Sequence, residues 1–169
     1  MTGDKAGPCN VARPYLPMVK NPEMMLEVVV AKWGPGPVET RQVSIGADGL
    51  FRSDRSEQTN LLPEGRAKLE RLAQDIRSGN ARIVCIMVTG HADRLGAAEY
   101  NQQLSKKRAD TVRALLVSNG LDGAVIRAEG RGEDKPVVAC KGTRQTPELV
   151  QCLQPNRRVT FGIMAGLGQ

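Results

Sequence analysis

The sequence predicts an α/β (α+β) two-layer sandwich, with a mixed sheet of about four strands and helices packed on one face. Two long stretches, 63–78 and 97–118, carry the terminal signals or the apolar spacing of helices. Short β-prone runs precede, separate and follow these two stretches. Strands and helices therefore alternate along the chain, as they do when helices pack on a sheet.

The first forty residues differ in composition from the rest of the chain. Residues 1–40 contain six of the ten prolines, which predicts a linker or extended arm. Within this arm the β-prone run 26–33 predicts a short additional edge strand. The domain proper is expected over 41–164, with 165–169 as a C-terminal tail. Its first strand is predicted at 42–45, where polar and apolar residues alternate.

The remaining elements follow from local signals. Pro63 and Glu64 favour the start of a helix, because proline and acidic residues suit a first turn. The continuous apolar run 83–88 predicts a central strand covered on both faces. The second long helix is expected to end at Asn119-Gly120, a common C-terminal signal. The last predicted elements are a short strand at 124–128, a short helix at 147–153 and an alternating strand at 157–164.

The overall charge is basic, with a net charge of +6. A basic domain suits an anionic partner, although the same charge also keeps a domain soluble. The five aromatic residues are too scattered to form a stacking platform, so we expect no nucleic-acid partner. No apolar run is long enough to span a bilayer, and the first residues lack the apolar segment of a secretion signal. The chain is therefore expected to be either cytoplasmic or a processed part of an exported protein.

The four cysteines contain no CxxC pair, so we expect no zinc site. Cys85 lies in an apolar run and is predicted to be a buried thiol, and Cys9 has no evident mate. Cys140 and Cys152 bracket a polar loop. If they pair, the closed loop stabilises the fold by about 3 kcal/mol and implies an oxidising compartment. The alternative is two unpaired thiols in a cytosolic protein.

Asp93 and Arg108 are the first candidate site residues. Asp93 follows a predicted strand directly, and Arg108 lies on the next helix. Asn101 is seven residues before Arg108, so both project from nearly the same side of that helix. Leu104 and Leu115 share this largely apolar side, where an arginine needs a partner. One acid and one base can hold a zwitterion, or they can form an internal salt bridge that ties helix to sheet.

Around these residues, a series of landmarks occurs in a fixed order. They are Thr89-Gly90-His91, Asp93, Gly96, Tyr100-Asn101, Leu104-Ser105, Arg108-Ala109, Gly130-x-Gly132, Pro136 and Asn156-Arg157-Arg158-Val159. Together they cover about residues 42–163 and resemble the OmpA-like C-terminal domain family. That family includes the periplasmic domains of outer-membrane protein A, the peptidoglycan-associated lipoproteins and the flagellar stator B subunits. Several motifs in order are a far more specific signal than any one alone.

The resemblance implies a βαβαβ-type topology and non-catalytic binding of peptidoglycan through the diaminopimelate of its stem peptide. Asp93 would bind the ammonium group and Arg108 the carboxylate of that side chain. Asn101 matches a position that donates or accepts a ligand hydrogen bond, and Thr89 and Leu104 would lie beside the pocket. The chemistry is sensible in itself, because guanidinium fits a carboxylate in a two-point fork and aspartate suits a compact ammonium.

Arg157 and Arg158 are weaker candidates from the same resemblance. Adjacent side chains of a strand point to opposite faces, so at most one of the two is expected to face the pocket and the other to face solvent. The sequence shows no metal-ligand cluster and no nucleophile beside His91, its only histidine. We therefore expect neither an enzyme nor a bound cofactor or metal.

One segment departs from the family pattern. Phe51-Arg52-Ser53-Asp54 keeps only the first aromatic of the corresponding family stretch, and the loop up to Pro63 is longer. This departure motivates an alternative, a structural or assembly module that mediates protein contact or homodimerisation with a degenerate wall site. Peptidoglycan binding would place the protein in the periplasm, attached to the outer membrane or cell envelope. The membrane link would then reside in a segment outside this sequence.

Overall fold

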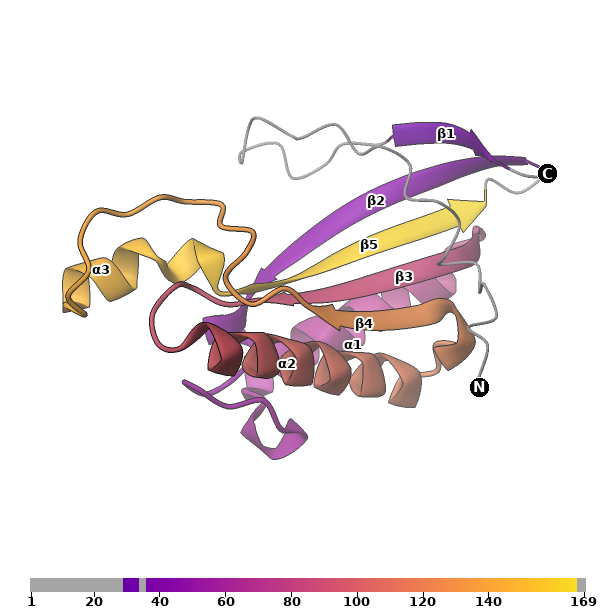
Figure 1. The fold of residues 1–169 in the computed structure, drawn as a ribbon. Helices are drawn as coiled ribbons and strands as arrows, with labels where there is room; N and C mark the ends of the chain where they lie inside the picture. The colour runs from indigo at the N-terminus through magenta and orange to yellow at the C-terminus, as the bar shows by residue number, and fades with distance from the viewer. Residues whose placement is uncertain (1–28, 34–35, 167–169) are drawn as a thin grey trace, which may run out of the picture.

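The computed structural model describes residues 29–33 and 36–166, with side chains from residue 39 onward. A five-stranded sheet in the order β1-β2-β5-β3-β4 has α1 and α2 on one face, so the two-layer prediction is confirmed (Figure 1). The strands are β1 (Val29–Trp33), β2 (Gly36–Gly46), β3 (Arg82–His91), β4 (Ile126–Gly130) and β5 (Arg158–Gly166). The helices are α1 (Pro63–Ser78), α2 (Ala98–Ser118) and α3 (Pro147–Cys152).

The sheet is mixed, as expected. β3 and β4 are parallel and are joined through α2, whereas the β1–β2, β2–β5 and β5–β3 pairs are antiparallel. The order of elements from β2 to β5 agrees with the predicted alternation of strands and helices. β1 adds a fifth strand at one edge, so the sheet exceeds the expected four.

The start of the sheet differs from the domain boundary expected at residue 41. β2 begins at Gly36 and pairs antiparallel with β1. Pro37 lies at the end of this ladder, where the absence of an N–H group is tolerated. Residues 1–28 of the predicted arm lie outside the described part of the chain, as do residues 167–169 of the predicted tail.

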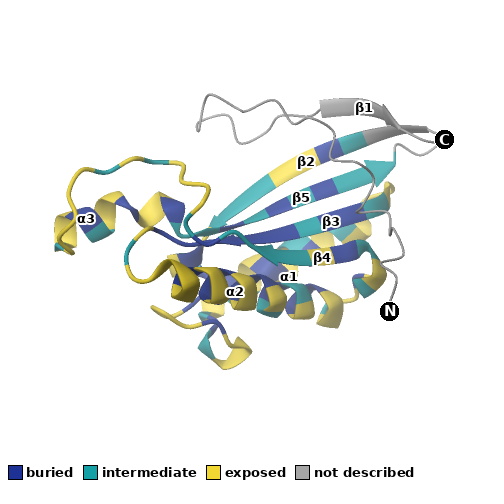
Figure 2. Ribbon diagram, in the orientation of Figure 1, coloured by how far each residue is buried: buried dark blue, intermediate teal, exposed yellow. Residues whose placement is uncertain are grey.

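The core lies between the sheet and the two long helices. Along β5, buried and partly buried residues alternate, because one face of the strand packs on the helices. Figure 2 shows buried residues along β3 and β5 and exposed residues along the outer side of α2. The largest fully buried side chains of the core are Leu50, Phe51, Leu69, Ile86, Leu116, Ile126 and Phe161.

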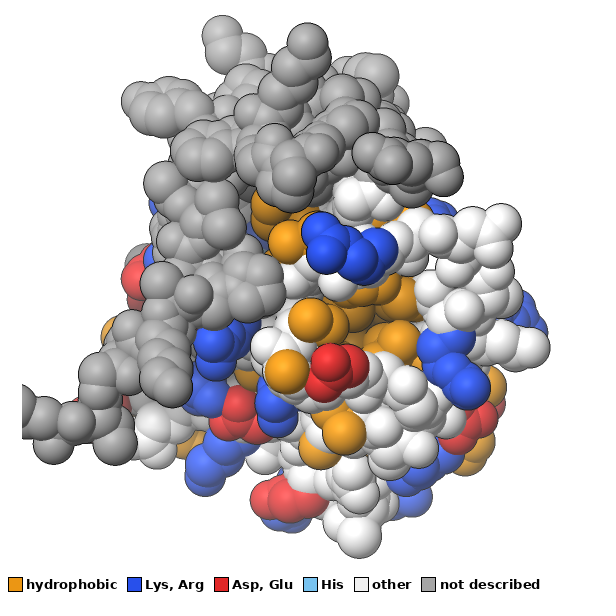
Figure 3. All heavy atoms as spheres, turned by 90° about the vertical axis from the view of Figure 1, so that its right-hand side faces the viewer, with side chains coloured by type: hydrophobic (Ala, Val, Ile, Leu, Met, Phe, Trp, Pro, Cys, Tyr) orange, Lys and Arg blue, Asp and Glu red, His pale blue; other side chains and the backbone are white. Residues whose placement is uncertain are grey.

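Apolar side chains lie at the surface of the end of the sandwich away from α3. Figure 3 looks onto this end and shows apolar side chains gathered in a shallow hollow among charged ones. Partly buried apolar residues pack against the core from β2, α1 and β3, among them Val43, Leu72, Ile76 and Ile83. Within the described ranges, no helix is both long and apolar enough to cross a membrane.

The backbones of helix and sheet come into close contact where α2 crosses β3 and β4. A Cβ atom at Gly90 would lie 2.0 Å from the carbonyl oxygen of Ser105, and one at Gly130 would lie 2.5 Å from the backbone nitrogen of Lys106. The fully buried Ser105 hydroxyl accepts a hydrogen bond of 2.9 Å from the Gly132 N–H. Only glycine therefore permits this backbone approach, which sets the height of α2 over the ends of both strands.

Cys140 and Cys152 form a disulfide, which joins the loop after β4 to the end of α3. This confirms the pairing that the sequence left open. Cys85 is buried, as its apolar surroundings predict, but it is disulfide-bonded and not the free thiol that was expected. Local hydrophobicity reports burial of a cysteine and carries no information about its bonding.

We predict that Gly90→Ala lowers the free energy of unfolding by about 3 kcal/mol or more, because its Cβ would force α2 away from β3. Urea unfolding followed by circular dichroism measures this loss. Gly46→Ala is the matched control, since Gly46 has an ordinary φ of −60° and open space around it. The control should change the stability by less than about 1 kcal/mol. Equal stability of the two variants would contradict the proposed contact.

Candidate functional site

A cavity of about 560 Å³ opens where the end of β3 meets the start of α2. Five parts of the chain line it: 48–54, Leu62 before α1, the loop and helix from Asp93 to Arg108, the 145–150 segment, and Arg157 next to the start of β5. These parts are brought together by the sheet, since β2, β3 and β5 lie beside one another.

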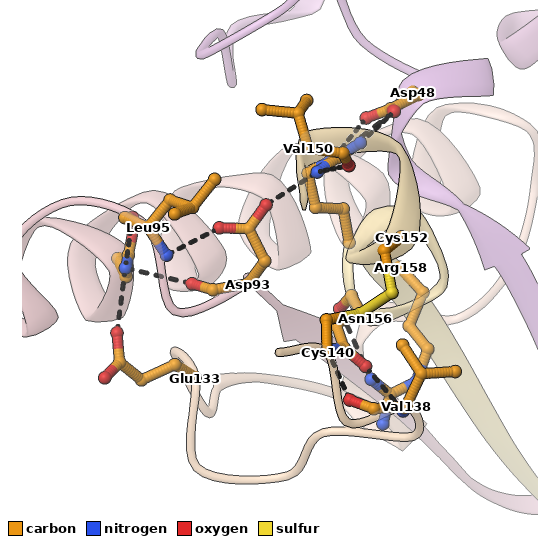
Figure 4. A network of polar contacts seen from close by, with 12 residues as sticks. Asp48, Asp93, Leu95, Glu133, Val138, Cys140, Val150, Cys152, Asn156 and Arg158 are labelled. Atoms are coloured by element: carbon orange, nitrogen blue, oxygen red, sulfur yellow. Dashed lines mark hydrogen bonds and ion pairs between the residues drawn. A yellow bond between two sulfur atoms is a disulfide. The ribbon is translucent and has the colours of Figure 1, made fainter. Parts of the chain in front are cut away.

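Asp93 is 8% exposed and is held through both of its oxygens. Its Oδ1 accepts a 2.8 Å hydrogen bond from the Leu95 N–H, which closes the turn before α2. Its Oδ2 accepts a 2.6 Å charge-assisted hydrogen bond from Nη1 of Arg157 (Figure 4). The carboxylate is therefore oriented before any ligand arrives.

Arg108 is a buried cation on α2, only 4% exposed. Its Nε donates a 2.8 Å hydrogen bond to the Arg55 carbonyl, and its guanidinium carbon lies 5.4 Å from the centre of the Phe51 ring. No carboxylate of the described residues forms an ion pair with it. Burial accordingly lowers the pKa of Arg108, an effect that the nearby Asp48 and Asp54 partly oppose.

The internal Asp93–Arg108 salt bridge, which the sequence allowed, does not form. Asp93 pairs with Arg157 instead, and Arg108 faces the cavity with Nη nitrogens that have no hydrogen-bond partner among the described residues. These Nη nitrogens are open to the cavity, since His91 Nδ1 is the only fully buried side-chain nitrogen or oxygen without a partner in the described ranges, and an anion there would gain charge-assisted hydrogen bonds from them. The arrangement therefore favours an anion in the cavity beside Arg108.

Asn101 lies one turn before Ser105 on α2 and is 5% exposed. Its side-chain nitrogen contacts the Asp93 carbonyl at 3.0 Å, the Leu95 carbonyl at 2.9 Å and the Glu133 carboxylate at 2.9 Å. Asn101 thus binds the Asp93 turn to the helix. No described residue donates a hydrogen bond to its Oδ1, which leaves that oxygen as an acceptor at the cavity.

Leu104 lines the cavity as expected, but Thr89 does not. Gly90 faces α2, so the neighbouring Thr89 points to the opposite face of the sheet. There its hydroxyl donates a 3.3 Å hydrogen bond to Glu129. The expectation that Thr89 lies beside the pocket is wrong, because alternation along β3 places its side chain on the other side of the sheet.

Of the two adjacent arginines, Arg157 faces the cavity and Arg158 does not. Arg157 contacts Asp48, Asp93 and the Val150 carbonyl. These interactions raise the pKa of Arg157, with the hydrogen bond to Asp48 the largest cause. Arg158 is half-buried and donates a 3.0 Å hydrogen bond to the Lys135 carbonyl. The second arginine thus points away from the cavity, and it is half-buried rather than fully exposed to solvent.

The segment that departs from the family pattern forms one wall of the cavity. Phe51 is buried beneath Arg108, and the Ser56 carbonyl accepts a hydrogen bond from the Thr111 hydroxyl on α2. Together with the Arg55 contact to Arg108, this pins the loop onto the helix. Asp54 adopts a positive φ of 53° and lines the cavity, a conformation that aspartate tolerates better than most residues.

The opposite wall comes from the disulfide-bonded segment. Gln145 and Val150 line the cavity from this side. Arg94, the neighbour of Asp93, donates hydrogen bonds to the carbonyls of Cys140 and Gly142, at 3.0 and 2.5 Å. The Asp93 turn and the disulfide segment are therefore linked directly. Asp48, Gln145 and Val150 had no local sequence signal, because only long-range packing brings them to the cavity.

His91 lies outside the cavity, on the same sheet face as Thr89. Its Nε2 is 3.3 Å from the Thr160 hydroxyl, and its buried Nδ1 has no described partner. Burial, followed by the charges of Arg158 and Arg131, lowers the pKa of His91 to about 4. The ring is therefore neutral at pH 7. In the described ranges, no group of His, Cys, Asp and Glu residues is arranged to hold a metal ion.

The sequence model of the OmpA family matches residues 55–148, which is more than half of the chain. The chain belongs to the OmpA family. It is 36% identical over 128 residues to outer membrane protein A of Shimwellia blattae, covering 75% of this chain and 52% of that protein. With outer membrane protein A of Shigella flexneri it shares 36% identity over 132 residues, which cover 76% of this chain and 37% of that protein. The chain thus spans about half or less of these relatives.

Several solved structures have the same fold as this chain. The peptidoglycan-associated lipoprotein of Burkholderia pseudomallei superposes with a TM-score of 0.53 and 27% identity, covering 71% of this chain and 88% of that one. The cell wall anchor of the T6SS from Pseudomonas aeruginosa gives 0.53 and 30%, covering 82% and 87%. The periplasmic domain of Helicobacter pylori MotB gives 0.55 at 18% identity and shows the fold alone, covering 82% of each chain.

We predict that this OmpA-family domain loses stability as the pH falls from 7 to 5 through the buried His91. Its folded pKa of about 4 lies below the ordinary 6.5, so the unfolded chain binds the proton first as the pH drops. The loss should be roughly 2 kcal/mol at pH 5. Urea unfolding of the wild type and of His91→Gln at both pH values measures it. A pH slope of equal size in both proteins would assign it to other groups.

Proposed function

We propose that this domain binds peptidoglycan without catalysis, through the diaminopimelate side chain of the stem peptide. The observation that carries the proposal is the buried Arg108, which faces a cavity that also contains Asp93 and has no carboxylate partner of its own. A buried guanidinium without an anion favours a ligand that brings a carboxylate. Such binding would tether an outer-membrane or envelope protein to the cell wall.

The roles of the lining residues follow from their donors and acceptors. Arg108 offers its Nη nitrogens to the ligand carboxylate in a two-point fork. Asp93 and the side-chain oxygen of Asn101 supply acceptors for the ammonium group at the same end of α2. Leu104 provides an apolar surface for the methylene groups that join the two charges. The lining thus combines the polar groups that a zwitterion needs with an apolar contact.

The names of two structural neighbours also support peptidoglycan binding. One structural neighbour is named as peptidoglycan-associated and another as a cell wall anchor, at 27% and 30% identity. The disulfide between Cys140 and Cys152 suits an oxidising compartment, which agrees with a periplasmic location attached to the outer membrane or envelope. The fit of the cavity to a zwitterion is what extends this likeness to diaminopimelate.

The site also provides a basis for selectivity. A lysine side chain carries the ammonium but lacks the carboxylate, so it would leave Arg108 unpaired in the cavity. Leaving a buried charged donor unsatisfied costs more than the loss of an ordinary hydrogen bond. We therefore infer a preference for diaminopimelate-type over lysine-type stem peptides.

The alternative function, an assembly module that forms homodimers, predicts a different behaviour in solution. It requires a stable homodimer whose association is indifferent to a diaminopimelate-containing peptide. Light scattering with and without the peptide separates the two functions. The anchoring of the 51–63 loop on α2 favours wall binding, because the departure from the family pattern leaves Phe51 and the Arg55 carbonyl in place around Arg108.

We predict that Asp93→Ala and Arg108→Ala each weaken binding of a diaminopimelate-containing stem peptide at least about thirtyfold, since each removes one partner of a desolvated charge pair. Isothermal titration calorimetry on the purified chain measures the Kd, and the corresponding lysine-containing peptide should bind the wild type comparably weakly.

Arg71→Ala is the matched control, because Arg71 is exposed on α1 and outside the cavity. It should bind like the wild type. Circular dichroism and thermal melting check that all three variants remain folded. Undiminished binding by both folded site variants would rule out the assigned site, and sedimentation with intact sacculi tests the same ranking on the polymer.

A further inference from the structure

Arg157 forms ion pairs with two carboxylates, and it makes more hydrogen bonds to Asp48 than to Asp93. Its Nε and Nη2 lie 3.0 and 2.9 Å from the oxygens of Asp48, which is the two-point contact of a guanidinium fork. Its Nη1 alone reaches Asp93, at 2.6 Å, and also donates a 3.1 Å hydrogen bond to the Val150 carbonyl. Figure 4 includes Asp48, Asp93 and Val150 in the same network of polar contacts. Asp48 is thus its main counter-ion.

This sharing matters for ligand binding, because the ammonium group assigned to Asp93 must compete with Arg157. One oxygen of Asp93 is engaged by the Leu95 N–H and the other by Arg157. An ammonium that approaches Asp93 therefore either replaces Nη1 or meets its positive charge at close range. The Arg157 side chain is only 18% exposed, so it cannot turn to bulk water without losing favourable contacts.

We propose that Asp48 is a positioning residue of the ligand site. It holds Arg157 in the two-point fork, so that Asp93 can exchange Nη1 for the ligand ammonium without leaving the guanidinium unpaired. Nη1 keeps the Val150 carbonyl as its acceptor throughout. This inference rests on the proposed function, since it explains how Asp93 becomes available to a cationic amine.

The charge balance supports an exchange of this kind. The charged residues that line the cavity are three acids and three bases, namely Asp48, Asp54, Asp93, Arg52, Arg108 and Arg157, so their charges cancel. A zwitterionic ligand leaves this sum unchanged and adds one opposite charge beside each of Asp93 and Arg108. Without Asp48, two cations, the guanidinium of Arg157 and the ligand ammonium, would share the single carboxylate of Asp93. Binding of an amine would then be weaker.

The backbone around this contact is held independently of the side chains. The Ala47 N–H donates a 2.8 Å hydrogen bond to the Arg157 carbonyl, and β2 and β5 pair directly up to Gly46 and Arg158. Asp48 itself is 41% exposed in its side chain. Asp48→Asn therefore keeps the shape of the residue and the backbone contact while removing the charge that holds Arg157.

A double-mutant cycle tests the proposal. Calorimetry measures the Kd of the diaminopimelate-containing stem peptide for the wild type, Asp48→Asn, Arg157→Gln and the double variant. Asp48→Asn should weaken binding about tenfold when Arg157 is present and less than about twofold when it is absent, because Asp48 acts through Arg157. An equal loss in both backgrounds would mean that Asp48 touches the ligand or supports the fold generally, and would overturn the proposal.

A spectroscopic measurement keeps the test decisive if Arg157→Gln binds no peptide. The Nε–H signal of Arg157 in the wild type should remain protected from solvent exchange at saturating peptide, since the fork on Asp48 persists. It should lose that protection in Asp48→Asn. Loss of protection in the wild type on peptide addition would overturn the proposal. A wild-type chain that binds no peptide would refute the proposed function as well, whereas normal binding by Asp48→Asn refutes the positioning role alone.

Discussion

The close backbone contact of α2 with β3 and β4 is the constraint on which the rest of the structure depends. Gly90 and Gly130 allow it because neither has a side chain between strand and helix, and the buried Ser105 lies between them. Asn101 and Arg108 stand about one helical turn on either side of Ser105, on the same side of α2. The contact therefore places both residues over the end of β3, where Asp93 begins the turn into the helix.

Electrostatics then determine what this end of the sandwich can bind. Arg108 is buried over the Phe51 ring with a backbone carbonyl as its only described acceptor, whereas Arg157 has two carboxylates. Arg157 is therefore neutralised by carboxylates of the protein itself, whereas Arg108 remains available to an anionic ligand. Under the proposed function, a ligand carboxylate would pair with Arg108, and a ligand amine would exchange with Arg157 at Asp93.

Much of this arrangement could be predicted from local residues. Asp93, Asn101, Leu104 and Arg108 come from one strand–turn–helix unit, so their spacing and helical phase were enough to bring them to one cavity. Thr89 failed the same reasoning because a one-residue step along β3 reverses the face of the sheet. The disulfide between Cys140 and Cys152 was foreseeable as a pairing across a short loop, but its contact with Arg94 was not.

The sequence by itself determined the alternation of strands and helices, the ends of the two long helices and the local half of the site, because periodicity and turn signals act over short distances. Only the tertiary structure decided which cation pairs with Asp93. Arg157 is 64 residues from Asp93 and 109 from Asp48 along the chain. The pairing of β2 with β5 and of β5 with β3 brings these three residues together, and no local pattern records strand order. The strand order of the sheet therefore determines that Asp93 pairs with Arg157 and not with Arg108.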